Sequence, residues 1–138
     1  MTFYYRKKNI TNYMLKYKYT ILWAVWVIII VTLCFISPPQ VPDAPRIPYL
    51  DKIAHFGFYF GYTCLFIAAF YNETKRFHSA KKCFLWAFIT AVILGGLIEL
   101  LQGSLTVNRS GDIMDVFFNT FGTIVALCFM TRFRVLFR

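Results

Sequence analysis

The sequence predicts an all-α fold, a four-span transmembrane helical bundle with both termini in the cytoplasm, and three observations support it. The 138 residues are 59% hydrophobic and only 15% charged, whereas a soluble domain carries about 25% charged residues. The apolar residues collect in four runs, each long enough to cross roughly 30 Å of hydrocarbon as a helix. The segments that flank these runs are alternately rich and poor in Lys and Arg along the chain. We treat residues 1–138 as a single domain.

The first apolar run covers residues 20–36 and contains no charged side chain. Basic residues precede it, as they do in a secretory signal peptide. The run is longer than the hydrophobic region of such a peptide, lacks a small-residue cleavage site, and is followed by Pro38 and Pro39. We therefore expect an uncleaved signal anchor, which forms the first span.

The segment after the first run is rich in proline. All prolines of the chain lie between positions 38 and 48, and from Pro39 to Pro48 a proline recurs at every third position. The resulting proline–polar–apolar repeat extends to Leu50, and three residues per turn is the period of polyproline II. We expect residues 39–50 to adopt this conformation. Its aliphatic face would rest on the bundle or on lipid, or the segment would act only as a stiff linker.

The second run, residues 53–71, is interrupted only by His55. Asp51 lies four residues before this histidine, so the two side chains share one face of the predicted helix. Gly57 and Gly61 form a pair of small residues one turn apart, a spacing that permits close approach of a neighbouring helix.

Polar residues lie late in the third run and early in the fourth. The third run, residues 83–103, carries Glu99 and Gln102 near its end. The fourth run covers residues 113–131. Steps of three, four and three residues define one stripe at the start of that helix, formed by Asp112, Asp115, Asn119 and Gly122.

The basic residues indicate the topology. Most of the fifteen Lys and Arg residues lie on one side of the membrane. They occur before the first run, between the second and third runs, and after the fourth run. The other side has only Arg46, Lys52 and Arg109. The positive-inside rule then places both termini in the cytoplasm. This distribution argues against nucleic acid as a partner and favours a multi-pass membrane protein.

Because the four spans alternate in direction, their polar residues should meet at the outer end of the bundle. We predict a ligand-binding cluster of Asp51, Lys52, His55, Glu99, Gln102, Arg109, Asp112, Asp115 and Asn119. Polar groups within the membrane normally face the bundle interior and pair with one another. Such a cluster is therefore either a hydrogen-bond network that holds the helices together or a site for a ligand.

Several chemistries fit a ligand site. Arg109, Lys52 and His55 could hold a lipid phosphate. A divalent cation could instead bind through the oxygens of three carboxylates, those of Glu99, Asp112 and Asp115. If the protein is an enzyme, its catalytic residues would be His55, Glu99 and Asp115, since a carboxylate–histidine pair can act as acid and base. The chain has no C-x-x-C motif, so the sequence predicts no metal site of that kind and no cofactor.

The same residues resemble the motifs of the VanZ-like family of small bacterial membrane proteins. The quoted motifs are Asp51-Lys52-x-x-His55-Phe56, Glu99-x-x-Gln102 and Arg109-x-x-Asp112-x-x-Asp115-x-x-x-Asn119-x-x-Gly122. The resemblance covers about residues 15–131. Family members often carry a second glycine four residues after the position of Gly122, where this chain has Ala126. The namesake of the family is associated with low-level resistance to the glycopeptide teicoplanin. The resemblance implies a multi-pass protein of the cytoplasmic (inner) membrane of a bacterium with an envelope-related role, and it provides no reaction to transfer.

From these observations we expect a protein that binds a lipid or lipid-linked headgroup at an outward-facing polar pocket. Its partners would be a membrane lipid or a lipid-linked envelope precursor, and another membrane protein. The alternatives are a membrane-embedded enzyme that acts on a phosphate-bearing lipid headgroup and a structural partner of an envelope complex. A transporter is disfavoured because the polar residues stop near one interface instead of lining a path through the membrane.

Overall fold

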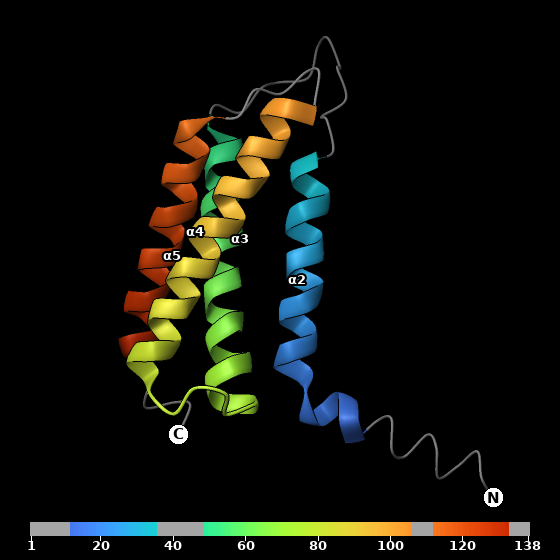
Figure 1. Ribbon diagram of the computed structural model, residues 1–138, viewed down its shortest axis with the longest axis vertical. Helices are drawn as coiled ribbons and strands as arrows, with labels where there is room; N and C mark the ends of the chain where they lie inside the picture. The colour runs from blue at the N-terminus through green and yellow to red at the C-terminus, as the bar shows by residue number, and fades with distance from the viewer. Residues whose placement is uncertain (1–11, 36–48, 106–111, 133–138) are drawn as a thin grey trace, which may run out of the picture.

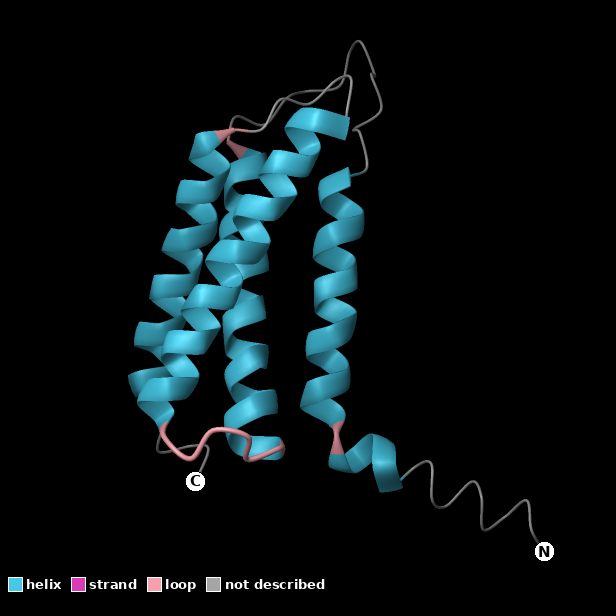
Figure 2. Ribbon diagram, in the orientation of Figure 1, coloured by secondary structure: helices cyan, strands magenta, loops and turns pink. Residues whose placement is uncertain are grey.

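The computed structural model describes residues 12–35, 49–105 and 112–132. Four helices in these residues are long and apolar enough to cross a membrane, and no strand is present among them (Figures 1 and 2). They are α2 (Lys18–Phe35), α3 (Leu50–Ile67) with its continuation η1 (Ala68–Glu73), α4 (Ala80–Leu105) and α5 (Ile113–Arg132). The predicted all-α, four-span architecture is therefore confirmed.

The helices begin and end close to the predicted boundaries. The predicted spans 53–71, 83–103 and 113–131 each lie within one of the helical segments, and 20–36 does so except for residue 36, which is not described. Most helices extend a few residues beyond the apolar runs, because backbone hydrogen bonding continues into the polar flanks. The sequence analysis did not predict the π-helix η1.

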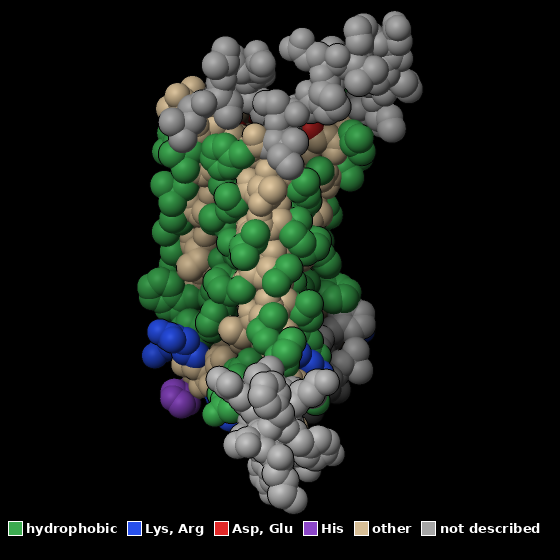
Figure 3. Space-filling view, turned by 90° about the vertical axis from the view of Figure 1, so that its right-hand side faces the viewer, with side chains coloured by type: hydrophobic (Ala, Val, Ile, Leu, Met, Phe, Trp, Pro, Cys, Tyr) green, Lys and Arg blue, Asp and Glu red, His purple; other side chains and the backbone are tan. Residues whose placement is uncertain are grey.

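The surface of the bundle is suited to hydrocarbon. Exposed large apolar side chains occur on every helix; examples are Leu22, Ile53, Leu97 and Phe121. Figure 3 shows hydrophobic side chains over the middle of the visible face and Lys and Arg side chains near its lower end. A continuous apolar surface of this kind is unfavourable in water and matches the lipid-facing side of a membrane helix.

Helices α3 and α5 approach most closely at a glycine that the sequence pattern does not single out for this role. A Cβ atom added to Gly122 would overlap the carbonyl oxygen of Phe56 on α3. In the predicted small-residue pair, a Cβ on Gly61 would meet the Trp26 ring at 2.9 Å, but Gly57 has open space around it. Close approach therefore depends on Gly122 and Gly61, and Gly57 takes no part in it.

Helix α2 stands to one side of the other three helices in Figure 1 and has few buried residues. Aromatic contacts attach its middle to α3 and η1. The Trp23 ring packs edge-on against Phe66 and Phe70, with centroids 5.9 and 5.1 Å apart. The Trp26 indole N–H donates to the carbonyl of Phe58 over 2.9 Å.

Side chains from other helices also satisfy backbone groups at both ends of α2. At its start, the Glu73 carboxylate accepts hydrogen bonds from the backbone N–H groups of Tyr19, at 3.0 Å, and Thr20, at 2.8 Å. At its end, Gln102 Nε2 donates to the Cys34 carbonyl over 2.5 Å. Helix ends leave such groups without partners inside the helix. Glu73 and Gln102 therefore hold α2 in place along its axis.

We expect Glu73→Ala to destabilise the protein by about 1–3 kcal/mol, because two N–H groups of α2 lose their acceptor. Thermal unfolding in detergent, followed by circular dichroism, measures this loss. Arg76→Ala, a change at an exposed position on the same connection, should leave the melting temperature near that of wild type. Equal melting temperatures for the two variants would contradict the capping role.

The predicted polyproline II segment lies largely outside the described residues, which resume at Tyr49. Its last repeat was predicted incorrectly. Tyr49 has left-handed backbone angles, with φ 63° and ψ 12°, and Leu50 already belongs to α3. The Tyr49 carbonyl accepts a hydrogen bond from the Ile53 N–H over 3.1 Å, so helix formation replaces the extended conformation here.

Candidate functional site

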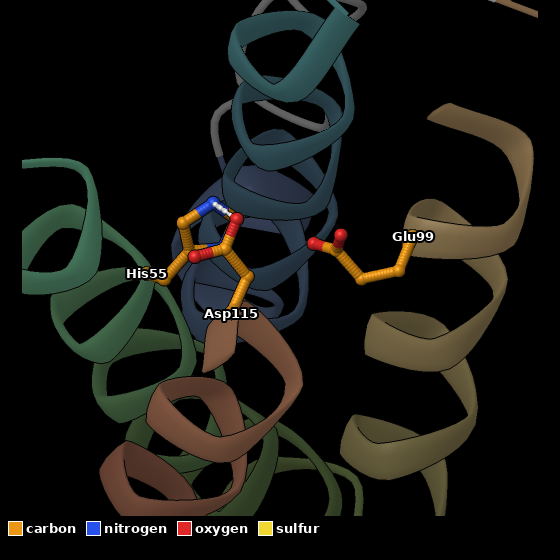
Figure 4. Close-up of side chains that lie close together, drawn as sticks. All are labelled: His55, Glu99 and Asp115. Atoms are coloured by element: carbon orange, nitrogen blue, oxygen red, sulfur yellow. Dashed lines mark ion pairs between the residues drawn. The ribbon is translucent and has the colours of Figure 1, made fainter. Parts of the chain in front are cut away.

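Three polar side chains from three helices converge at one end of the bundle. His55 on α3, Glu99 on α4 and Asp115 on α5 point toward one another in Figure 4. One ligand atom from each side chain lies within 4.8 Å of those from the other two. His55 and Glu99 are buried, with 5% and 6% of their surface exposed. The convergence expected from the sequence is therefore present for these three residues.

Asp112 sets the start of α5 and links it to α4. Its Oδ1 accepts the Met114 N–H over 2.9 Å, which is the usual contact of a helix N-cap. Its own backbone N–H donates to Glu99 Oε2 over 3.0 Å. The chain therefore enters α5 in a position that is fixed against the end of α4.

Lys52 lies among three carboxylates. Its Nζ is 3.2 Å from Asp51 Oδ2 and 2.5 Å from Asp112 Oδ2, and it also donates to Asp115 Oδ1. The hydrogen bond from Lys52 holds the pKa of the Asp112 carboxyl below its usual range. The charge of this lysine is therefore already balanced by protein groups, which makes it a poor sole anchor for a phosphate.

Asn119 orients the imidazole of His55. Asn119 Oδ1 lies 3.0 Å from His55 Nδ1, and because an amide oxygen only accepts, Nδ1 carries the hydrogen. The other ring nitrogen, Nε2, then faces Asp115 Oδ2 at 3.4 Å. A carboxylate and an imidazole lone pair in this position repel each other unless a proton or a cation lies between them.

Two buried oxygen atoms at the cluster have no hydrogen-bond partner among the described residues. They are Glu99 Oε1 and the hydroxyl of Tyr59, which is 1% exposed. Gly95 provides space beside the Tyr59 hydroxyl, since a Cβ there would lie 3.3 Å from that oxygen and 3.1 Å from Asn119 Nδ2. Tyr59 was not among the predicted site residues; its only sequence signal is its position one turn after His55.

The structure gathers seven of the nine predicted site residues in one network: Asp51, Lys52, His55, Glu99, Asp112, Asp115 and Asn119. Gln102 is directed to the end of α2 instead, and Arg109 lies outside the described residues. Within the network, three carboxylates contact Lys52 and a fourth, that of Glu99, accepts from the Asp112 N–H. With all four ionised and His55 neutral, the balance is −3 (four negative charges and one positive). The described part of the cluster is therefore acidic.

Comparison with protein families gives one finding. A family model described as VanZ/LLP1 matches residues 2–135, which is nearly the whole chain. No curated protein and no solved structure matches.

Proposed function

The chain belongs to the VanZ/LLP1 family and is a multi-pass membrane protein, and from this premise we propose that it binds the headgroup of an envelope lipid or a lipid-linked envelope precursor. The binding residues are those of the acidic network at the joined ends of α3, α4 and α5. They provide charged and polar groups where a headgroup would meet the membrane surface.

The unpartnered oxygens of Glu99 and Tyr59 are the observation that carries this proposal. A network that served only to join helices would satisfy its buried polar groups, because each unsatisfied group costs about 1–3 kcal/mol. Two such oxygens, one on α3 and one on α4, are better explained as groups that bind a ligand. This favours a binding site over a purely structural partner of an envelope complex.

The negative charge of the network limits the kinds of headgroup that it can bind. Carboxylates accept hydrogen bonds from hydroxyl and ammonium groups, such as those of sugars and amines. A bare phosphate would be repelled by the four carboxylates, with Lys52 already paired. The proposed ligand therefore presents hydroxyl or amine donors to the network, and any phosphate it carries lies away from the carboxylates.

An enzyme that acts on such a headgroup is the second candidate. It is favoured by the contact of His55 Nε2 with Asp115 Oδ2 and by the hydrogen bond between His55 Nδ1 and Asn119 Oδ1. This arrangement keeps one imidazole nitrogen directed at a carboxylate, as acid–base chemistry requires. In that case His55, Glu99 and Asp115 are the catalytic residues.

Lipid retention tests the proposal. We expect native mass spectrometry of the protein, released from nanodiscs containing phosphatidylethanolamine, phosphatidic acid and a polyisoprenyl diphosphate sugar, to show about one retained lipid with an amine or sugar headgroup. Ser104→Ala, an exposed change near the end of α4, serves as the control and should retain the same lipid. Retention of phosphatidic acid alone, whose headgroup is a bare phosphate, or of no lipid, would rule out the proposed headgroup chemistry.

The proposed location is the cytoplasmic membrane of a bacterium, with both termini inside and the network facing outward. Basic residues of the described chain support it. They concentrate at the end of the bundle where α2 begins and α5 ends, opposite to Lys52 (Figure 1).

Cysteine labelling in intact cells checks this orientation. In a background without the four native cysteines, Ser104→Cys should react with a membrane-impermeant maleimide, whereas Ser79→Cys should react only after permeabilisation. The reason is that Lys75, Arg76, Lys81 and Lys82 flank Ser79 and retain it in the cytoplasm. Labelling of Ser79→Cys alone in intact cells would reverse the orientation.

A further inference from the structure

We infer that His55, Glu99 and Asp115 form a binding site for one divalent transition-metal ion, Zn²⁺ or Mn²⁺. The site uses one imidazole nitrogen and two carboxylate oxygens from α3, α4 and α5. It differs from the all-oxygen site expected from the sequence, because Asp112 is engaged with Lys52 and the start of α5, and His55 takes its place. The inference does not depend on the headgroup that the protein binds.

The orientation of His55 is the first argument. With Nδ1–H bonded to Asn119 Oδ1, Nε2 presents a lone pair toward Asp115 Oδ2. Metal-bound histidines usually donate their second ring N–H to an oxygen in this way, which fixes the tautomer and the ring plane. A metal ion between Nε2 and Oδ2 removes the repulsion between the two atoms.

The spacing of the ligand atoms is the second argument. Zn²⁺ binds nitrogen and oxygen at about 2.0–2.2 Å, which places two ligands of a tetrahedral site about 3.3–3.6 Å apart. His55 Nε2 and Asp115 Oδ2 are 3.4 Å apart. The three ligand atoms all lie within 4.8 Å of one another, so the longer separations must shorten by no more than about 1.3 Å, which small side-chain rotations supply.

The unused oxygens are the third argument. Glu99 Oε2 is occupied by the Asp112 N–H, whereas the buried Oε1 has no partner among the described residues. The two carboxylate oxygens of Asp115 also differ in their neighbours: Oδ1 accepts a hydrogen bond from Lys52, and Oδ2 faces His55. Each carboxylate therefore has one oxygen that is hydrogen-bonded to the protein and one that is available to the proposed ion.

The charge of the network also favours a cation. Carboxylates that are buried together without compensation are strongly unfavourable. A divalent ion changes the balance of the described network from −3 to −1 with His55 neutral (−3 plus 2). Imidazole together with carboxylate suits Zn²⁺ and Mn²⁺ better than Ca²⁺ or Mg²⁺, which prefer oxygen ligands alone.

Manganese binding tests the inference without any added lipid. The purified protein in detergent is treated with a chelator, dialysed, and titrated with Mn²⁺ while the paramagnetic resonance signal of free Mn²⁺ is recorded. We expect about one tightly bound ion per chain, which Zn²⁺ displaces. Spin-echo modulation of the bound ion should show coupling to an imidazole ¹⁴N, a readout that can be obtained on the wild-type protein without any variant.

Charge-matched variants separate a built site from general attraction to acidic groups. Glu99→Gln and Asp112→Asn each remove one negative charge, but only Glu99 is a proposed ligand, and asparagine retains the helix cap. We expect Glu99→Gln and His55→Gln to weaken Mn²⁺ binding at least about tenfold, and Asp112→Asn to weaken it by less than about threefold. His55→Gln leaves the charge balance of a neutral histidine unchanged.

Three results would overturn the metal site: no stoichiometric binding, no imidazole nitrogen coupling, or equal weakening by Glu99→Gln and Asp112→Asn. Lipid retention by a protein that binds no Mn²⁺ would refute the metal site and leave the headgroup proposal standing. Stoichiometric Mn²⁺ binding without lipid retention would support the metal site and refute the headgroup proposal. Circular dichroism of each variant shows whether it is folded, and the nitrogen coupling decides the question if His55→Gln does not fold.

Discussion

Glu99→Gln and Asp115→Asn are each expected to lower retention of the bound lipid at least tenfold while the helical fold persists. Both changes keep the size of the side chain and remove its charge. The amide oxygen at position 99 can still accept the Asp112 N–H, and the one at position 115 can still accept from Lys52, so the contacts between helices remain. A charge-assisted hydrogen bond to a ligand contributes about 1.5–3 kcal/mol, which corresponds to roughly ten- to hundredfold in affinity.

Native mass spectrometry measures the retention, and the melting temperature in detergent measures the fold. Asp51→Asn is the matched comparison at the edge of the network, and we expect it to lower lipid retention less than either of the other two changes. It also removes a carboxylate that contacts Lys52, but the Asp51 side chain is 54% exposed and not part of the converging trio. If both variants at Glu99 and Asp115 kept full lipid retention, the acidic network would serve only to hold the helices together. If lipid loss followed loss of folded protein in each case, the same conclusion would apply.

Gly122→Ala is expected to cause the largest loss of stability of any single methyl addition to the described glycines. The new Cβ would overlap the Phe56 carbonyl oxygen, and the carbonyl carbon would lie only 3.1 Å away. Backbone atoms cannot rotate out of the way, so α3 and α5 must move apart. Overpacking of this kind costs about 1–3 kcal/mol and sometimes more. Because Asn119 lies one turn before Gly122, the displacement should also pull Asn119 away from His55 and reduce ligand binding.

Gly57→Ala provides the control on the facing helix. A Cβ at position 57 has nothing within 4 Å, and alanine is the better helix former by about 1 kcal/mol. Gly57→Ala should therefore melt at or slightly above the wild-type temperature, whereas Gly122→Ala should melt well below it. A Gly122→Ala protein as stable as wild type would show that α3 and α5 do not pack in the described register.

The sequence determined the number, type and approximate ends of the spans, because these depend on local properties. The length of an apolar run decides whether a helix can cross the membrane, and the position of a polar residue within the run decides its depth. Depth alone was enough to predict that His55, Glu99 and Asp115 would lie at the same end of the bundle. The fold class and the central part of the candidate site follow from this information.

Only the tertiary structure decided which polar group meets which. Spacing along one helix cannot fix the rotation and axial shift of another helix, and an offset of one residue turns a helical side chain by about 100°. Gln102 lies three residues after Glu99 near the end of the same apolar run, but its side chain donates to a carbonyl at the end of α2. Asp112 was predicted as a cation ligand but caps α5. Gly57 was predicted to allow close packing but has open space around it, whereas Gly122, not predicted for this role, lies against a backbone carbonyl.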